Sequence, residues 1–488
     1  MTAVLARRSP GPARHVYDVI VIGGQLGGII SATLLARRGM QVLFVDHDTG
    51  AAPYQHAEWK LSHAPFVIPS IKNISVFDEI LLEVGLLPTV QRLMHPVTVQ
   101  VLSATQRFEL PSEAEARTKE LARALGEGAD AFEASWQQAT RSASDTDPFF
   151  LAKPDLPPEG IFSRWKFRRT LPRFQEALEA MTPLRNATLL GLAPFLTGLE
   201  QPPPLALSRV LAKTLGSAHV VTGGREGLHH VFIDRARELG VDVLNAGDTV
   251  EALSFDGNKP VGIRLTRNDT IYRASFIVAG CDVATLAGLV PEARRKPLQK
   301  WVSALESKRA VFTMNVVLPE VALPRGLGAL AVLDSPDAEL GGLLLQVSPA
   351  ESTADRVLSL SAKVPLALRA GGEPAVKALM HRVWAAVDGV MPFTRSHAKL
   401  QSSAWMDAPR VVAGAFEPLP LMPSVEESVL GVSALTLSSP YQRLLFANRQ
   451  VLPGLGFEGE VLTALRAVRL IERVLHKNDP LKHRRPAA

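Results

Sequence analysis

Cysteine is almost absent from this chain of 488 residues, where Cys281 is the single example. One cysteine excludes an intramolecular disulfide framework and any metal site built from several cysteines. No metal site is expected, and a reducing, cytoplasmic setting fits this composition.

Long apolar runs are absent too. No segment reaches the roughly 18 uninterrupted apolar residues of a membrane-spanning helix. Residues 1–15 contain three arginines but no apolar stretch, so we expect a flexible leader and not a secretory signal. Residues 477–488 are expected to form a second flexible tail.

A basic stripe with interleaved aromatic residues, typical of nucleic-acid binding, is also missing. The net charge is only +5, the positive charges are spread along the chain, and aromatic residues make up 6%. Nucleic acid is therefore not an expected partner. The densest basic run lies at 476–485, where a solvated terminus is expected and peripheral contact with anionic lipid is the alternative.

What the chain does contain is a βαβ pattern near its start. Tyr17–Ile22 reads as a buried strand, Gly28–Arg38 as an apolar helix stopped by Gly39, and Gln41–Asp46 as the next strand. Hydrophobic residues make up 47% of the chain and charged residues 21%, as in ordinary globular enzymes. The pattern predicts a dinucleotide-binding fold.

The turn in this pattern departs from the G-x-G-x-x-G fingerprint at one place. It reads Gly23, Gly24, Gln25, Leu26, Gly27, Gly28, so that Gln25 stands where the second glycine lets a pyrophosphate approach. Either the phosphate is displaced or no nucleotide binds. Asp46, followed by His47, ends the second strand and can accept hydrogen bonds from a ribose, although a solvated strand-end acid is the alternative.

Further along, the pattern predicts a second group of strands. These are expected within 311–318, 329–332, 343–347 and 358–362, too many to join the first sheet, so a separate domain follows. A long helix is expected from Glu113, with Ser112 and Glu115 as a capping box.

Across nearly the whole length, the order of motifs resembles the phytoene desaturase and carotenoid isomerase branch of the amine oxidase-type FAD-dependent oxidoreductases. The N-terminal fingerprint, the Gly223-Gly224 turn before a helix, and Pro453-Gly-Leu-Gly-Phe-Glu-Gly carry the resemblance. It implies an α/β fold with a Rossmann-like FAD-binding domain (16–75, 205–300 and 440–476) and a second α+β substrate domain (76–204 and 301–439).

The resemblance also implies the residues that would hold FAD. Val250 would meet the adenine through its backbone, and the C-terminal segment would approach the flavin. The candidate cofactor residues are Gly23, Gly24, Gln25, Leu26, Gly27, Gly28, Asp46, His47, Val250, Arg449, Gly454, Gly456, Phe457 and Glu458.

Four departures from the family pattern fall on this site. They are Gln25, Ala51-Ala52-Pro53 in place of Gly-Gly-Arg, His63-Ala64-Pro65 in place of Asp-x-Gly-Pro, and Asn448-Arg449 in place of Gly-Asp. Arg449 reverses a charge and could neutralise the pyrophosphate in place of the lost arginine. Gln25 could donate an amide hydrogen bond to a shifted phosphate.

Two functions remain open. One is an FAD-dependent oxidoreductase with a rebuilt cofactor site that acts on an apolar, isoprenoid-type substrate by desaturation, oxidation or isomerisation. The other is a flavin-free relative that serves as a scaffold or binds an apolar ligand or partner. Cys281-Asp282 is expected in a buried loop, His229 and His230 are expected to face different directions, and Tyr54, His56 and His63 are placed near the cofactor by family position. No catalytic residue is assigned.

Overall fold

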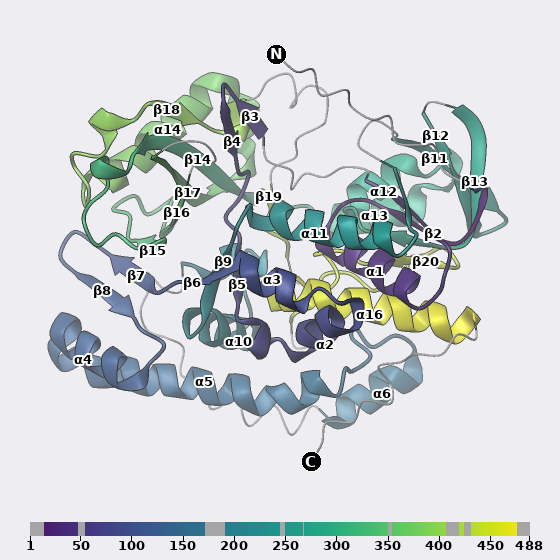
Figure 1. The fold of residues 1–488 in the computed structure, drawn as a ribbon, viewed down its shortest axis with the longest axis horizontal. Helices are drawn as coiled ribbons and strands as arrows, with labels where there is room; N and C mark the ends of the chain where they lie inside the picture. Colours follow the sequence, from purple (N-terminus) through teal and green to yellow (C-terminus); the bar gives the residue numbers. More distant parts are fainter. Residues whose placement is uncertain are drawn as a thin grey trace.

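A computed structural model describes residues 14–46, 54–170, 191–244, 249–266, 268–349, 354–406, 419–423 and 431–475. Its strands form two large sheets, which lie on opposite sides of the view in Figure 1. The mixed α/β fold predicted from the sequence is confirmed.

The first sheet combines strands from both ends of the chain. Its order is β10-β2-β1-β13-β12-β11, and β20 pairs with β13. The strands are β1 (Val16–Ile22), β2 (Val42–Val45), β10 (Asp242–Leu244), β11 (Val250–Asp256), β12 (Lys259–Leu265), β13 (Asn268–Ala279) and β20 (Leu444–Phe446). All neighbours among β10, β2, β1, β13 and β20 are parallel, so their carboxyl ends share one edge.

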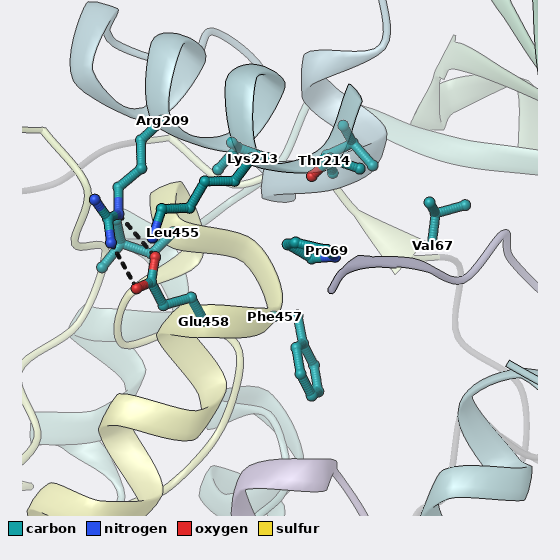
Figure 2. Close-up of a pocket in the computed structure, with 10 residues that line it drawn as sticks. Val67, Pro69, Arg209, Lys213, Thr214, Leu455, Phe457 and Glu458 are labelled. Atoms are coloured by element: carbon teal, nitrogen blue, oxygen red, sulfur yellow. Dashed lines mark hydrogen bonds and ion pairs between the residues drawn. The ribbon is translucent and has the colours of Figure 1, made fainter. Parts of the chain in front are cut away.

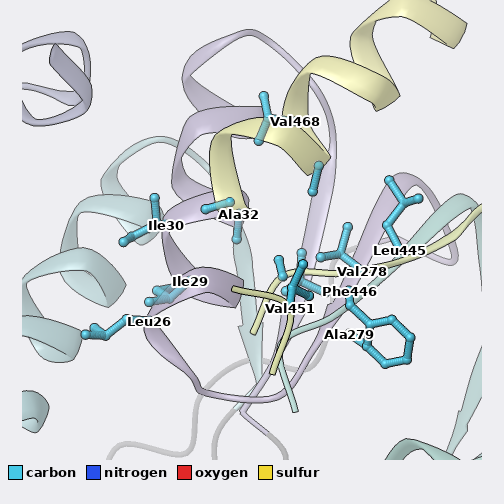
Figure 3. Close-up of a cluster of buried hydrophobic side chains, with 14 of the residues drawn as sticks. Leu26, Ile29, Ile30, Ala32, Val278, Ala279, Leu445, Phe446, Val451 and Val468 are labelled. Carbon is cyan, nitrogen blue, oxygen red and sulfur yellow. The ribbon is translucent and has the colours of Figure 1, made fainter. Parts of the chain in front are cut away.

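Helix α1 (Leu26–Arg37) is the buried centre of this half. It packs between α11 (Gly224–Glu238) and α16 (Gly456–Leu475), and residues 26–36 are all buried. Figure 3 shows its apolar side chains meeting those of β13, β20 and α16. A helix that is apolar on every side needs such cover.

The second sheet has the order β18-β14-β17-β16-β15-β7-β8, and β19 pairs with β14. Its strands are β7 (Val99–Leu102), β8 (Arg107–Leu110), β14 (Arg309–Pro319), β15 (Leu330–Leu333), β16 (Leu343–Pro349), β17 (Asp355–Pro365), β18 (Leu400–Ser402) and β19 (Leu419–Pro420). Helix α14 (Gly372–Asp388) packs in the same apolar cluster. The expected separate sheet is present, whereas the residue boundaries of the two domains stay a prediction.

The connecting segments are mainly helical. They comprise α2 (Ser75–Val84), α3 (Leu87–Leu93), α4 (Ala114–Leu125), α5 (Ala129–Leu151), α6 (Ile161–Thr170), α9 (Ala193–Thr197), α10 (Pro204–Leu215), α12 (Val283–Leu289) and α13 (Lys296–Ala304). Short strands β5 (Val67–Pro69), β9 (Ala218–Val221) and β6 (Met94–Pro96) form a small sheet, and β3 (Tyr54–His56) pairs with β4 (Trp59–Leu61). Helices α4, α5 and α6 follow the lower edge of the view in Figure 1.

The expected long helix from Glu113 is interrupted, and its capping box is absent. Gly126, with a φ of 53°, ends α4 before α5 begins. No side chain caps α4; Glu115 instead pairs with Lys119, with 2.6 Å between Oε1 and Nζ. Glu115 thus makes an i,i+4 ion pair on the exposed face of the helix and does not cap it.

None of the helices in the described ranges combines the length and the apolar character needed to span a membrane.

Candidate functional site

The glycines of the β1–α1 turn are packed tightly against two other chain segments. Gly23 has a φ of 103°, and a Cβ there would lie 2.6 Å from the Cβ of Cys281. A Cβ on Gly27 would lie 2.5 Å from the carbonyl oxygen of Ala447. Gly24, Gly28 and Leu26 are buried in the same turn. The close approach of three segments therefore accounts for glycine at positions 23, 27 and 28 without a nucleotide.

Gln25 turns its side chain toward residues from two distant loops. Its Nε2 donates to Oδ1 of Asp282 at 2.7 Å, and its Oε1 accepts a 3.0 Å hydrogen bond from the backbone N–H of Arg449. Nη2 of Arg449 lies 2.8 Å from Oδ2 of Asp282. We call Gln25, Asp282 and Arg449 the turn triad; it stands beside the N-terminus of α1, and Gln25 makes no capping bond to that helix.

Neighbouring polar groups fix the loops that carry this triad. Asn448, which is fully buried, donates to the carbonyl oxygen of Cys281 at 2.6 Å. Gln450 accepts a 2.7 Å hydrogen bond from the backbone N–H of Val283 at the start of α12. Cys281 is buried as expected. Arg449 is already paired with the carboxylate of Asp282, so a pyrophosphate bound here would compete with that carboxylate for the guanidinium.

Sequence reasoning singled out Gln25 and Arg449 but gave Asp282 no role. Asp282 follows Gln25 by 257 positions, and only the fold brings them together. The available signal was an acid three residues after the end of β13, because β13 is parallel to β1 and ends at the same edge of the sheet as the β1–α1 turn.

At the other end of the candidate site, Asp46 holds an unsatisfied atom. Its Oδ1 is buried and has no hydrogen-bond partner among the described residues. Burial, reinforced by the nearby Glu226 and opposed by Arg237, raises the pKa of Asp46 to about 6. An orphaned carboxylate oxygen at the end of β2 is what a ribose hydroxyl would satisfy. His47 lies outside the described residues, and Val250 is buried at the start of β11.

His229 on α11 is a second buried group with an orphaned atom, which the sequence did not reveal. Its Nε2 has no partner among the described residues, and its ring lies 6.3 Å from that of Phe44 on β2. Burial, with His230 and Arg225 nearby, lowers its pKa to about 4. His230 is exposed and faces Glu226, so the two histidines do diverge. Within the described ranges, no group of three metal-ligating side chains occurs.

The C-terminal segment packs closely against α9, α2 and the chain around Val432. Cβ atoms on Gly454 and Gly456 would approach Val432 and Leu196 to 2.6 Å and 2.2 Å. Phe457 packs edge-on against Phe77, with 4.9 Å between ring centres. These close contacts again suffice to explain the glycines.

Glu458 forms a bidentate ion pair with the buried Arg209, at 2.7 and 2.8 Å (Figure 2). Arg209 also contacts Asp147, and its guanidinium lies over the ring of Phe150. The carboxylates overcome burial and raise the pKa of Arg209. The adjoining cavity, lined also by Val67 and Pro69, measures about 20 Å³, room for about one water molecule and not for a flavin ring.

Tyr54 and His63 are neighbours, with 5.3 Å between ring centres, and Tyr54 packs in the apolar cluster of the second sheet. Asn315 on β14 donates to the Tyr54 hydroxyl at 3.2 Å. His56 instead approaches Ser402 on β18, with Nδ1 3.3 Å from Oγ. Their place near a cofactor stays a prediction, because residues 47–53 and Ala51-Ala52-Pro53 within them lie outside the described ranges.

No known family profile matches the sequence. The chain is 26% identical over 322 residues to a hydroxyneurosporene desaturase from Rubrivivax gelatinosus, in a match that covers 60% of this chain and 59% of the desaturase. The chain thus spans about six-tenths of that relative's length.

Solved structures resemble the chain over almost all of its length. An oxidoreductase from Methanosarcina mazei has a TM-score of 0.58 at 13% identity, covering 92% of this chain and 99% of the other. Cyclohexylamine oxidase from Brevibacterium oxydans IH-35A has a TM-score of 0.56 at 16% identity, covering 94% and 99%. The chain therefore has the fold of these oxidoreductases, a two-sheet α/β fold with a Rossmann-like sheet.

Proposed function

We propose that this protein is an FAD-dependent oxidoreductase that acts on an apolar, isoprenoid-type substrate. The observation that carries the proposal is the buried, unpartnered Oδ1 of Asp46 at the carboxyl end of β2. Leaving such an oxygen unsatisfied costs free energy, which a ribose hydroxyl would recover. The fold shared with oxidoreductase structures supports the same conclusion.

The residues around α1 would hold the two ends of FAD differently. Asp46 would accept hydrogen bonds from the ribose, and the backbone N–H groups at the start of α1 would face the pyrophosphate. Gln25 would donate its amide to a phosphate oxygen by exchanging its bond to Asp282, and Arg449 would supply positive charge. Bound FAD supplies the capacity to accept electrons, while the protein orients it and excludes water.

The proposed substrate class rests on the likeness to the hydroxyneurosporene desaturase. We place the reaction among desaturations, oxidations and isomerisations of apolar chains. The face of the second sheet against which Tyr54 of β3 packs is the proposed location of the substrate.

A flavin-free scaffold or apolar-ligand-binding protein is the second candidate, and the turn triad favours it. Both polar atoms of the Gln25 side chain and Nη2 of Arg449 already have partners within the chain, and close packing explains Gly23, Gly27 and Gly28. Hydrogen bonds and packing within the chain therefore hold this turn in the absence of a ligand.

A FAD titration followed by absorption and flavin fluorescence tests the proposal. We expect the wild-type protein to bind about one FAD per chain, and D46N to weaken binding about tenfold or more because a neutral amide with one acceptor oxygen replaces the charged carboxylate that the ribose would contact. D256N, an exposed acid at the end of β11, is the matched control and should bind normally. Absence of binding after FAD addition would establish the flavin-free candidate, and unchanged binding by D46N would remove Asp46 from the site.

Two further variants report on the turn triad. R449A should weaken FAD binding if the guanidinium neutralises phosphate, and unchanged affinity would rule that role out. Q25G separates two effects: weaker binding identifies Gln25 as a phosphate donor, whereas tighter binding shows that its side chain obstructs the pyrophosphate.

A further inference from the structure

Helix α6 presents large apolar side chains to solvent. Ile161 is 86% exposed, Phe162 88% and Trp165 52%. These residues are spaced three and four apart along the helix, so they form one continuous face. Phe167, two positions after Trp165, lies on the opposite side and is buried, with its ring 6.1 Å from that of Phe149. The helix is thus anchored by one side chain and turns its apolar face outward.

The same helix carries only positive charge. Arg164, Lys166, Arg168 and Arg169 are all exposed, and α6 contains no acidic residue. The guanidinium of Arg169 lies 3.5 Å from the centre of the Trp165 ring, which places charge directly beside the apolar face. Phe393 is also 80% exposed, but it is a single apolar side chain that follows α14, on a separate part of the molecule.

We propose that α6 is a docking helix for an anionic lipid bilayer. Ile161, Phe162 and Trp165 would enter the boundary between headgroups and acyl chains, while the four cations would contact lipid phosphates. Aliphatic and aromatic side chains together favour a bilayer over nucleic acid, which would stack on the aromatic rings but gain little from Ile161. Helix α6 lies at the lower edge of the molecule in Figure 1, beyond the end of α5.

This inference does not rest on the proposed function. A flavin-free protein would dock in the same way, and FAD binding can be measured without lipid. The densest basic run in the sequence, at 476–485, is a separate feature that every variant below retains.

Vesicle flotation of the full chain tests the proposal. We expect the wild type to float with vesicles of phosphatidylcholine mixed with phosphatidylglycerol, and far less with phosphatidylcholine alone. I161S/F162S/W165S should reduce binding to the mixed vesicles about tenfold or more, because three side chains lose apolar burial. R164Q/K166Q/R168Q should remove the preference for anionic lipid. F393S is the matched control and should float as the wild type does.

Several outcomes would overturn the assignment. Failure of the wild type to float, equal flotation of the triple serine variant, or equal loss in F393S would each do so. Gel filtration and an RNA-binding assay on the same variants test two other occupants. If the protein binds no vesicles and the variants lose self-association, α6 contacts a second copy of the chain. If the protein binds no vesicles and the variants lose RNA binding, α6 contacts nucleic acid. Circular dichroism confirms that each variant is folded.

Discussion

At the scale of single residues, Asp46 and His229 titrate in overlapping ranges and affect stability in opposite directions. The pKa of Asp46 rises from 3.8 to about 6 on folding, so the folded protein keeps a proton that the unfolded chain has released, and stability falls as the pH rises through this range. The pKa of His229 falls from 6.5 to about 4, so the unfolded chain binds the extra proton and stability is lost as the pH falls.

In the wild type the two effects of pH on stability oppose each other, so removing either group should expose the effect of the other. In D46N only His229 remains, so the free energy of unfolding should rise with pH between about pH 4 and 6, by on the order of 2 kcal/mol more than in the wild type. In H229Q only Asp46 remains, so the free energy of unfolding should fall with pH over the same range, by on the order of 2 kcal/mol relative to the wild type. Urea unfolding at a series of pH values measures both slopes, with D256N as the control. Slopes parallel to the wild type would show that neither group is linked to folding.

At the scale of elements, the sequence predicted β1, α1 and β2 well because their signals are local. Apolar runs, the glycine turn and Gly39 all lie within one short stretch. The reason for each glycine was not local: Cys281 and Ala447 face the turn from far along the chain. The same limit applies to the break between α4 and α5, where Gly126 outweighs an otherwise helical pattern.

The packing role of the turn predicts a sharp contrast between two alanine substitutions. G27A places a Cβ 2.5 Å from a backbone oxygen and should destabilise the protein by about 2 kcal/mol or more. G288A lies within α12 with no atom within 4 Å of its added Cβ, and should be neutral or stabilising by up to about 1 kcal/mol. Thermal unfolding measures both. Equal stability of the two variants would show that the turn has room for a side chain.

At the scale of the whole molecule, the ion pair between Arg209 and Glu458 connects α10 and α5 with the start of α16. Sequence reasoning assigned Glu458 to the cofactor, a role that remains a prediction. Its pairing with Arg209 could not be foreseen, because the partner lies 249 positions away on a helix without a distinctive motif. The turn triad was hidden for the same reason.

Breaking this ion pair should destabilise the folded protein, because the buried guanidinium of Arg209 then has less negative charge beside it. We expect E458Q to lower the free energy of unfolding by about 3 kcal/mol, and R209M/E458M to recover part of that loss. E115Q removes an ion pair whose two side chains are 73% and 75% exposed, and should cost less than about 0.5 kcal/mol. Denaturant unfolding compares the three. Similar losses in E458Q and E115Q would contradict the assigned burial.

The place of β13 in the first sheet has a consequence for biosynthesis. Ile277–Ala279 pairs with β20, which leaves the ribosome only after the entire second sheet has been made. Until then, a central and strongly apolar strand keeps an open edge of the kind that recruits other chains. The nascent protein is thus exposed to aggregation throughout translation of its middle part, and it depends on β20 to cover this edge of β13.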